Sequence, residues 1–202
     1  MQQKRYAGKL AAVLSVLCSV FFLTGCGEEK NGTQITGLQI GKDGRVTSNI
    51  VETFEKEFYT IEGLNAMIQE EITAYNANHP EAILLKTAEL YGEDEVLVTM
   101  EYASDEDYMD FNKQELFFGT VAEAEAAGFE LDVELVSVSD AAVTITKEDI
   151  AGMADSYILI IRENMQVLLP QKVLYMTAGT ELINSKSINV QKTDGLTYVI
   201  MK

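Results

Sequence analysis

The hydrophobic positions of the chain recur at two periods, which predict one clear helix and a larger number of strands. The helical period of three and four residues is carried by Ile61, Leu64, Ile68, Ile72 and Tyr75. Thr60 stands where an N-cap is expected, and Pro80 disfavours helical geometry at the residue before it. We therefore expect a long helix over about residues 61–77.

Short apolar runs beside turn residues predict two β-hairpins. Residues 34–40 and 45–54 flank the turn Gly41-Lys42-Asp43-Gly44. Residues 82–90 and 95–102 flank a second turn that contains Gly92. Strands on both sides of such turns pair antiparallel, so these segments predict the start of an antiparallel sheet.

Polar cap residues predict two further, short helices. Ser104 is placed to cap an acidic helix that ends at about Asn112. Thr120 and Glu123 have the spacing of a capping box, and Gly128 suits the C-terminal end of a helix over residues 121–127. Between them, residues 115–118 predict a short strand.

Residues 147–169 fit two interpretations. The runs 157–161 and 166–169 are dense in Ile and Leu, as in strands, but Ile150, Met153 and Tyr157 also fit a helix opened by Thr146. Periodicity alone does not decide between the two for short apolar runs. We favour strands, because three later segments are also strand-like: residues 172–176, 187–191 and 196–201.

These elements predict an α+β fold, with mainly one antiparallel sheet, one long helix and one or two short helices. We expect residues 34–202 to form a single domain. The alternative is a division into two lobes, residues 34–134 and 135–202. At this length a chain buries enough apolar surface to be stable without disulfides.

The first 26 residues have the composition of an export signal. Lys4, Arg5 and Lys9 precede the apolar run 10–23, which ends in Leu23-Thr24-Gly25-Cys26. This stretch resembles the lipobox of bacterial lipoproteins. A transmembrane helix is the alternative, but it needs about 20 apolar residues and this run is shorter.

The resemblance implies a cellular location and a membrane anchor. A signal peptidase would remove residues 1–25 by cutting between Gly25 and Cys26, and a diacylglyceryl group on the Cys26 thiol would hold the protein in the membrane. Residues 26–33 would then be the lipidated tether. We expect a location on the extracytoplasmic face of the cell membrane, with no cofactor other than this covalent lipid.

A second resemblance concerns the N-terminal half of the domain. Its residues are Asp43-Gly44-x-Val46, Val51-Glu52-Thr53-Phe54, Phe58-Tyr59 and Ile68-x-Glu70-Glu71-Ile72. The pattern is similar to that of small lipoproteins of Gram-positive anaerobes. It implies no activity and no functional residues.

The charge of the chain limits its partners. The net charge is −17, and it becomes −20 without residues 1–25, which carry three basic and no acidic residues. Such a chain repels nucleic-acid phosphates, so we exclude nucleic acid as a partner. We expect the lipid to make the membrane contact. One interpretation of the charge is a partner, either an envelope protein or a cationic or neutral ligand. The alternative is that the acidity only keeps an exposed domain soluble.

Few residues are left for catalysis. By the lipobox resemblance, Cys18 would leave with the signal peptide and Cys26 would carry the lipid. His79 is the single histidine. This composition excludes a Cys- or His-based triad and a two-histidine zinc site. We therefore expect no catalytic residues and no enzyme activity, but a binding or scaffold domain at the cell envelope.

Two alternatives use the acidic residues. A hydrolase of envelope polysaccharide would need two carboxylates close together in a cleft, which 32 acidic residues do not identify from sequence alone. A calcium-stabilised interaction module would use Asp105, Asp107 and Asp110. These are weak metal candidates, because Met109 and Asp110 occupy the fifth and sixth positions of the corresponding EF-hand loop.

The anchor makes a direct prediction for Cys26→Ala. Without the thiol no lipid is attached, so this variant should leave the membrane fraction and appear in the soluble fraction of lysed cells. The matched control is Cys18→Ala, which removes the other cysteine and should stay membrane-bound. A Cys26→Ala variant found entirely in the membrane fraction would show that Cys26 is not the anchor.

Overall fold

Two strands in the C-terminal part of the chain bury side chains on both of their faces. In β8 (Tyr157–Ile161) the four residues after Tyr157 are buried, and in β13 (Thr197–Met201) all five are buried. Alternate side chains of a strand point to opposite faces of its sheet. These two strands therefore need apolar cover on two sides, and the other elements supply it.

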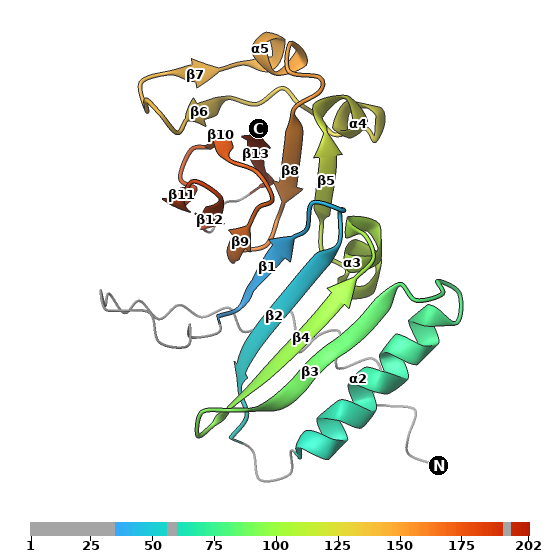
Figure 1. The fold of residues 1–202 in the computed structure, drawn as a ribbon. Helices are drawn as coiled ribbons and strands as arrows, with labels where there is room; N and C mark the ends of the chain where they lie inside the picture. The colour runs from blue at the N-terminus through green and yellow to red at the C-terminus, as the bar shows by residue number, and fades with distance from the viewer. Residues whose placement is uncertain (1–34, 56–59, 192–194) are drawn as a thin grey trace. The chain divides into compact units, whose positions relative to one another are not determined.

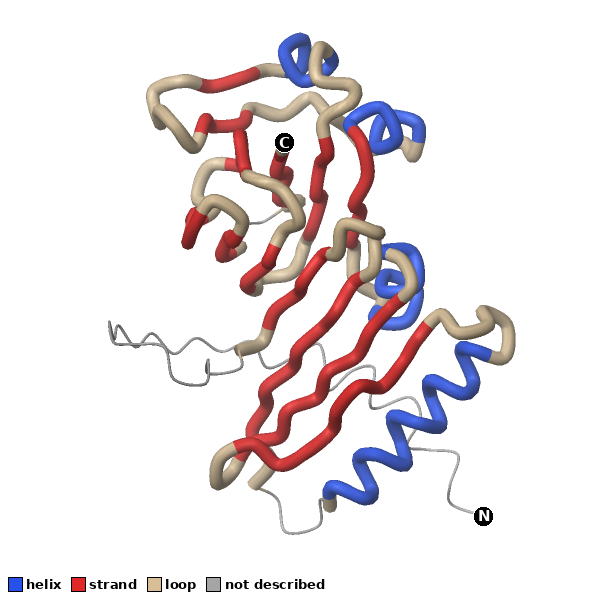
Figure 2. The backbone as a smooth tube through the Cα atoms, viewed as in Figure 1, coloured by secondary structure: helices blue, strands red, loops and turns tan. Residues whose placement is uncertain are grey.

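The computed structural model describes residues 35–55, 60–191 and 195–202, and this part of the chain is mostly β, with 13 strands in two sheets (Figures 1 and 2). By their contacts, residues from Gln34 to Lys202 belong to one compact unit. The seven-stranded sheet has, in spatial order, β11 (Glu181–Asn184), β12 (Ser187–Asn189), β9 (Gln166–Leu168), β1 (Gly37–Ile40), β2 (Val46–Thr53), β4 (Glu95–Tyr102) and β3 (Ile83–Tyr91). The six-stranded sheet has β5 (Leu116–Thr120), β8, β13, β10 (Val173–Thr177), β6 (Leu135–Ser137) and β7 (Thr144–Ile145).

Both predicted hairpins are confirmed in the seven-stranded sheet. β1 pairs antiparallel with β2, from Ile40 opposite Val46 to Gly37 opposite Asn49. β3 pairs antiparallel with β4, with a register shift between Leu85 and Thr87. β2 and β4 join the two hairpins. The pairing of β1 with β9 is parallel, unlike the other pairings in the described part of the chain.

Four helices are described, and their caps explain where they begin. They are α2 (Ile61–Asn76), α3 (Asp105–Asn112), α4 (Val121–Ala126) and α5 (Lys147–Ala151). The Thr60 hydroxyl accepts from the Gly63 N–H at 3.0 Å, as expected for the helix predicted at residues 61–77. The capping box of Thr120 and Glu123 is also present at α4. None of the helices among the described residues is long and apolar enough to cross a membrane.

The predicted fold class is wrong. An α+β fold built on one antiparallel sheet was expected, but the described chain is mostly β, it has two sheets, and no long helix dominates it. The reason is the density of apolar residues in β8 and β13. A single sheet covered by helices on one side would leave one face of these strands in water, whereas a second sheet and short helices cover both faces.

The two interpretations of residues 147–169 each describe part of the structure. Thr146 does open a helix, but α5 ends at Ala151. The strands β8 and β9 follow, as favoured from the sequence. Strands β6, β7 and β11 were not predicted, since they have two to four residues and little regular alternation.

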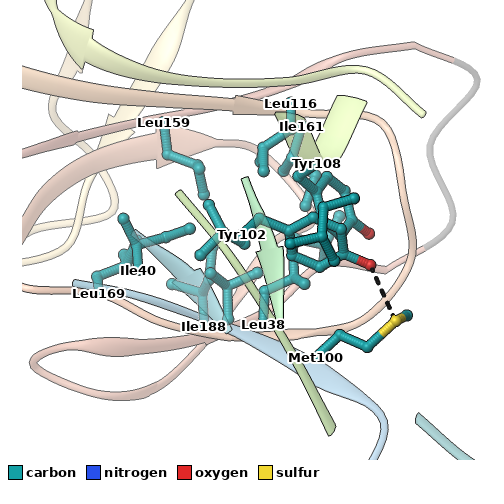
Figure 3. Close-up of a cluster of buried hydrophobic side chains, with 14 of the residues drawn as sticks. Leu38, Ile40, Met100, Tyr102, Tyr108, Leu116, Leu159, Ile161, Leu169 and Ile188 are labelled. Carbon is teal, nitrogen blue, oxygen red and sulfur yellow. Dashed lines mark hydrogen bonds between the residues drawn. The ribbon is translucent and has the colours of Figure 1, made fainter. Parts of the chain in front are cut away.

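The two sheets share one apolar core. One buried cluster contains residues of both sheets. The seven-stranded sheet contributes Leu38, Ile40, Met100 and Tyr102, and the six-stranded sheet contributes Leu116, Leu159, Ile161 and Met201. Figure 3 shows side chains from both sheets gathered around Tyr102, whose hydroxyl donates to the Met100 sulfur at 3.8 Å. This cluster therefore fixes one sheet against the other.

A second buried cluster covers the opposite face of the six-stranded sheet. Along β8 and β13, the residues of this cluster alternate with those of the first. They are Ile158, Ile160 and Ile200, and they are buried together with Val121 of α4 and Ile150 of α5. The short helices α4 and α5 thus cover the face that the seven-stranded sheet does not.

The parallel pairing of β1 with β9 predicts a destabilising effect for Gly37→Ala. A Cβ atom at Gly37 would lie 2.6 Å from the backbone oxygen of Gln166, so the two strands would have to move apart. We expect a loss of about 1–3 kcal/mol in the free energy of unfolding, measured with urea. The matched control is Gly195→Ala, where an added Cβ has no atom within 4 Å. Equal urea midpoints for the two variants would contradict the close approach of β1 and β9.

Candidate functional site

A hollow of about 520 Å³ brings together four lysines that lie far apart in the sequence. Its lining includes Lys42, Lys172, Lys186 and Lys202, with Phe118 and Tyr157 as aromatic residues and Pro170 and Gln171 completing it. We call it the lysine hollow. Its volume lies within the range of about 300–1,000 Å³ that is usual for small-molecule sites.

Two of the lysines are fixed by the central strands of the six-stranded sheet. Lys172 immediately precedes β10, and Lys202 immediately follows β13. The Lys202 N–H donates to the Lys172 carbonyl at 2.9 Å, and the reverse bond measures 3.3 Å. The ladder between β10 and β13 therefore continues for one residue and holds these two lysines side by side.

The other two lysines come from turns of the seven-stranded sheet. Lys42 lies in the turn between β1 and β2, which is closed by the bond from the Gly41 N–H to the Arg45 carbonyl at 2.8 Å. Lys186 lies in the turn between β11 and β12, and its ammonium donates to the Pro170 carbonyl at 2.9 Å. The shared apolar core thus positions lysines from both sheets around one hollow.

The two aromatic residues of the hollow stack on each other. The ring centroids of Phe118 and Tyr157 are 5.3 Å apart, with an angle of 20° between the ring planes. The Phe118 N–H donates to the Asp105 carboxylate at 2.8 Å, and Tyr157 is paired with Met201 at the start of β8. The hydrogen bond to Asp105 and the strand pairing with Met201 therefore hold the backbone of Phe118 and of Tyr157 in place.

The lysines of the hollow have no carboxylate partner among the described residues. The salt bridges in this part of the chain use Arg45, Lys86 and Arg162 as their cations. Even Asp43, the neighbour of Lys42 in sequence, pairs with Arg45 at 3.5 Å. Four lysines around one hollow make the local potential positive, which favours a bound anion.

The structure does not bring the predicted calcium ligands together. The Asp105 carboxylate accepts from Phe118, as above, and Asp107 accepts from the hydroxyls of Ser104 at 2.7 Å and Tyr75 at 3.1 Å. Asp110 lies in the same helix, α3. In the described residues no group of three or more acidic, histidine or cysteine side chains is placed to hold a metal ion. Ser104 caps α3, and the acids at its start lie near the positive end of the helix dipole, where Asp105 anchors β5 instead.

The carboxyl groups that a hydrolase would need are not found in the lysine hollow. Burial raises the pKa of Asp105 and of Glu163 above the usual carboxylate range, and neither residue lines the hollow. Glu163 accepts a hydrogen bond of 2.5 Å from the buried Tyr108. Its part in the fold is therefore to satisfy a tyrosine hydroxyl at the edge of the core.

A second, smaller hollow has the opposite charge. It has a volume of about 300 Å³ and is lined by Glu125, Phe129, Glu130, Leu131, Asp132 and Lys147. The two hollows show that the charge of this chain is unevenly distributed. The net charge therefore does not describe the environment of the lysine hollow.

The sequence contained no signal for the lysine hollow. Its four lysines are separated by 130, 14 and 16 positions and follow no common spacing. Only the pairing of β10 with β13 and the packing of the two sheets brings them together. The predicted lipidation and cleavage residues, Cys26 and Gly25, lie outside the described residues.

The buried carboxyl of Glu163 makes stability depend on pH. Burial raises the pKa of Glu163 in the folded state above the unfolded value of about 4.3. The stability that the protonated carboxyl contributes is therefore fully present below about pH 4.3. It is lost as the pH rises through the raised pKa. Glu163→Gln cannot ionise, and its amide oxygen still accepts from Tyr108. Relative to the parent chain, this variant should gain thermal stability between pH 5 and 7 and gain none at pH 4.

Tyr108→Phe is the matched variant for this test. The Tyr108 hydroxyl lowers the pKa of Glu163, so its removal should make the total loss of stability with rising pH larger and extend it to higher pH. A difference in melting temperature between Glu163→Gln and the parent chain that stays constant from pH 4 to 7 would rule out ionisation of Glu163 as the cause.

No protein-family model matches the chain, and comparisons with curated proteins and with solved structures find no match either. The functional argument therefore depends on the geometry of the lysine hollow.

Proposed function

We propose that the protein is a lipid-anchored, extracytoplasmic binding protein without catalytic activity, and that it binds an anionic ligand in the lysine hollow. The observation that carries this proposal is the convergence of four lysines without carboxylate partners on one hollow of a strongly acidic chain.

The composition of the chain makes this convergence informative. The sequence has 32 acidic residues against 15 lysines and arginines, so a lysine on this surface has carboxylates available to pair with. Lys86, for example, lies 3.7 Å from Glu101. Lys42, Lys172 and Lys202 are exposed and Lys186 is half-buried, and a group of lysines without carboxylate partners makes the local potential positive, which attracts anions.

The lysine hollow changes the expected charge of the ligand from positive or neutral to negative. A net charge of −17 led us to expect a cationic or neutral ligand, because net charge governs long-range attraction. At contact distance the nearest charges decide, since they interact through less solvent. We therefore propose an anion for the lysine hollow, while the acidic remainder of the surface keeps nucleic acids away.

The lipobox supports the location. A domain held by a lipid on Cys26 and a short polar tether would meet ligands of the envelope, either soluble or part of a polymer. No cofactor is required, because binding an anion among ammonium groups involves no covalent or redox step. The lysine hollow has no acidic side chain among its lining residues, so it gives the hydrolase alternative no support.

A charge-removal experiment tests the proposal. The triple variant Lys42→Gln, Lys172→Gln, Lys202→Gln leaves Lys186 and its bond to Pro170 in place. The full chain, purified in detergent, is titrated calorimetrically with pyrophosphate and with spermidine. We expect pyrophosphate to bind the parent chain and to lose at least about tenfold in affinity in the triple variant, because charge-assisted bonds contribute about 1.5–3 kcal/mol each.

The control variant removes the same three charges outside the hollow, as Lys86→Gln, Lys113→Gln, Lys147→Gln. It should bind pyrophosphate like the parent chain. Three results would contradict the proposal: no binding of pyrophosphate, equal losses in the two triple variants, or tighter binding of spermidine than of pyrophosphate at the same ionic strength.

A further inference from the structure

The lysine hollow has two kinds of lining, and an inorganic anion would use only one of them. Lysines supply positive charge, while Phe118 and Tyr157 supply a stacked aromatic wall. We infer that the ligand is a phosphorylated sugar, or a ring-bearing phosphoester of the same size, with its phosphate among the lysines and its ring against the aromatic wall. This inference rests on the proposed function, whose anion it specifies.

The lysines of the hollow are suited to binding phosphate. The hollow contains four lysines and no arginine. Arginine binds both carboxylate and phosphate through two parallel bonds, whereas lysine acts as a point charge and is a common phosphate ligand. The arginines of the described chain, Arg45 and Arg162, are instead paired with carboxylates.

The number of lysines indicates a ligand with more than one negative charge. A phosphomonoester carries about −1.5 to −2 at pH 7, and it presents three acceptor oxygens. Lys172 and Lys202 are neighbours across the ladder from β10 to β13, so two ammonium groups start from adjacent backbone positions. A single carboxylate would leave most of the positive charge around the hollow uncompensated.

The aromatic pair and the volume indicate a ring. At about 520 Å³ the hollow is larger than one phosphate group requires. Aromatic faces stack on the apolar faces of rings. The Tyr157 hydroxyl has no hydrogen-bond partner among the described residues, so it is available to a hydroxyl of the ligand.

The test compares four small probes on the full chain in detergent: glucose 1-phosphate, glycerol 3-phosphate, inorganic phosphate and glucose. We expect glucose 1-phosphate to bind at least about tenfold more tightly than glycerol 3-phosphate and inorganic phosphate, and glucose alone not to bind. The first comparison isolates the ring, because both esters carry the same charge.

Two variants assign the ring contact to the aromatic wall. Tyr157→Leu and Phe118→Leu keep apolar volume where the rings pack against the core, so that the fold is retained. Each should bring the affinity for glucose 1-phosphate down toward that for glycerol 3-phosphate, and leave the affinity for inorganic phosphate unchanged. Equal losses of affinity for glucose 1-phosphate, glycerol 3-phosphate and inorganic phosphate would overturn the inference that the ring of the ligand contacts the aromatic wall.

The same chemistry has two sources in an envelope, a free sugar phosphate or a phosphate-bearing polysaccharide. Phosphorylated dextran, with plain dextran as its control, distinguishes them. Tighter binding of the phosphorylated polymer per phosphate identifies a polymer, and tighter binding of glucose 1-phosphate identifies a free ligand; either result supports the inference.

The failures of the two proposals can be told apart. If pyrophosphate binds in a lysine-dependent way but glucose 1-phosphate binds no more tightly than glycerol 3-phosphate, the inference of a ring is overturned and the anion site stands. If no phosphate binds, both fail.

Discussion

The burial of β8 and β13 on both faces is the constraint on which the rest of the structure depends. Leu159, Ile161 and Met201 face the core that the two sheets share, while Ile158 and Ile200 face α4 and α5. Leaving either set in water would cost about 1.5–3 kcal/mol for each large side chain. The seven-stranded sheet on one side and the short helices on the other are the two layers that prevent this loss.

The same constraint positions the lysine hollow. Tyr157 begins β8 opposite Met201, the last residue of β13, and Lys202 follows directly. The hollow therefore lies at the ends of two strands that are buried on both faces, and packing on these faces holds their backbone. Lys42 and Lys186 come from turns of the seven-stranded sheet, and the shared core holds that sheet against the six-stranded one. The backbone around the hollow is thus held in place before any ligand binds.

The local elements were largely predictable from the sequence, whereas their assembly was not. Thr60 and Thr120 cap helices where the spacing of polar and apolar residues places them, because capping depends on residues three positions apart. The α+β class was wrong because a dense apolar run does not tell which layer covers its second face. The parallel pairing of β1 with β9 joins residues about 130 positions apart, and the sequence carries no local signal for it.

The candidate site was unpredictable for the same reason. Acidic clusters such as Asp105 and Asp107 stand out in a sequence because they are contiguous, and the structure assigns them to hydrogen bonds within the fold. The four lysines do not stand out, since long-range pairing alone collects them. Net charge also pointed away from an anion, because it averages over two hollows of opposite charge.

The most direct test of the anion site observes each lysine separately. The lysines of the full chain are dimethylated with ¹³C-formaldehyde, which keeps their charge, and their methyl signals are followed by NMR during a titration with pyrophosphate. The signals of Lys42, Lys172, Lys186 and Lys202 should shift together and saturate, while those of Lys86, Lys113 and Lys147 stay in place. Uniform shifts across all of these lysines, or none, would contradict the claim that the hollow is a binding site.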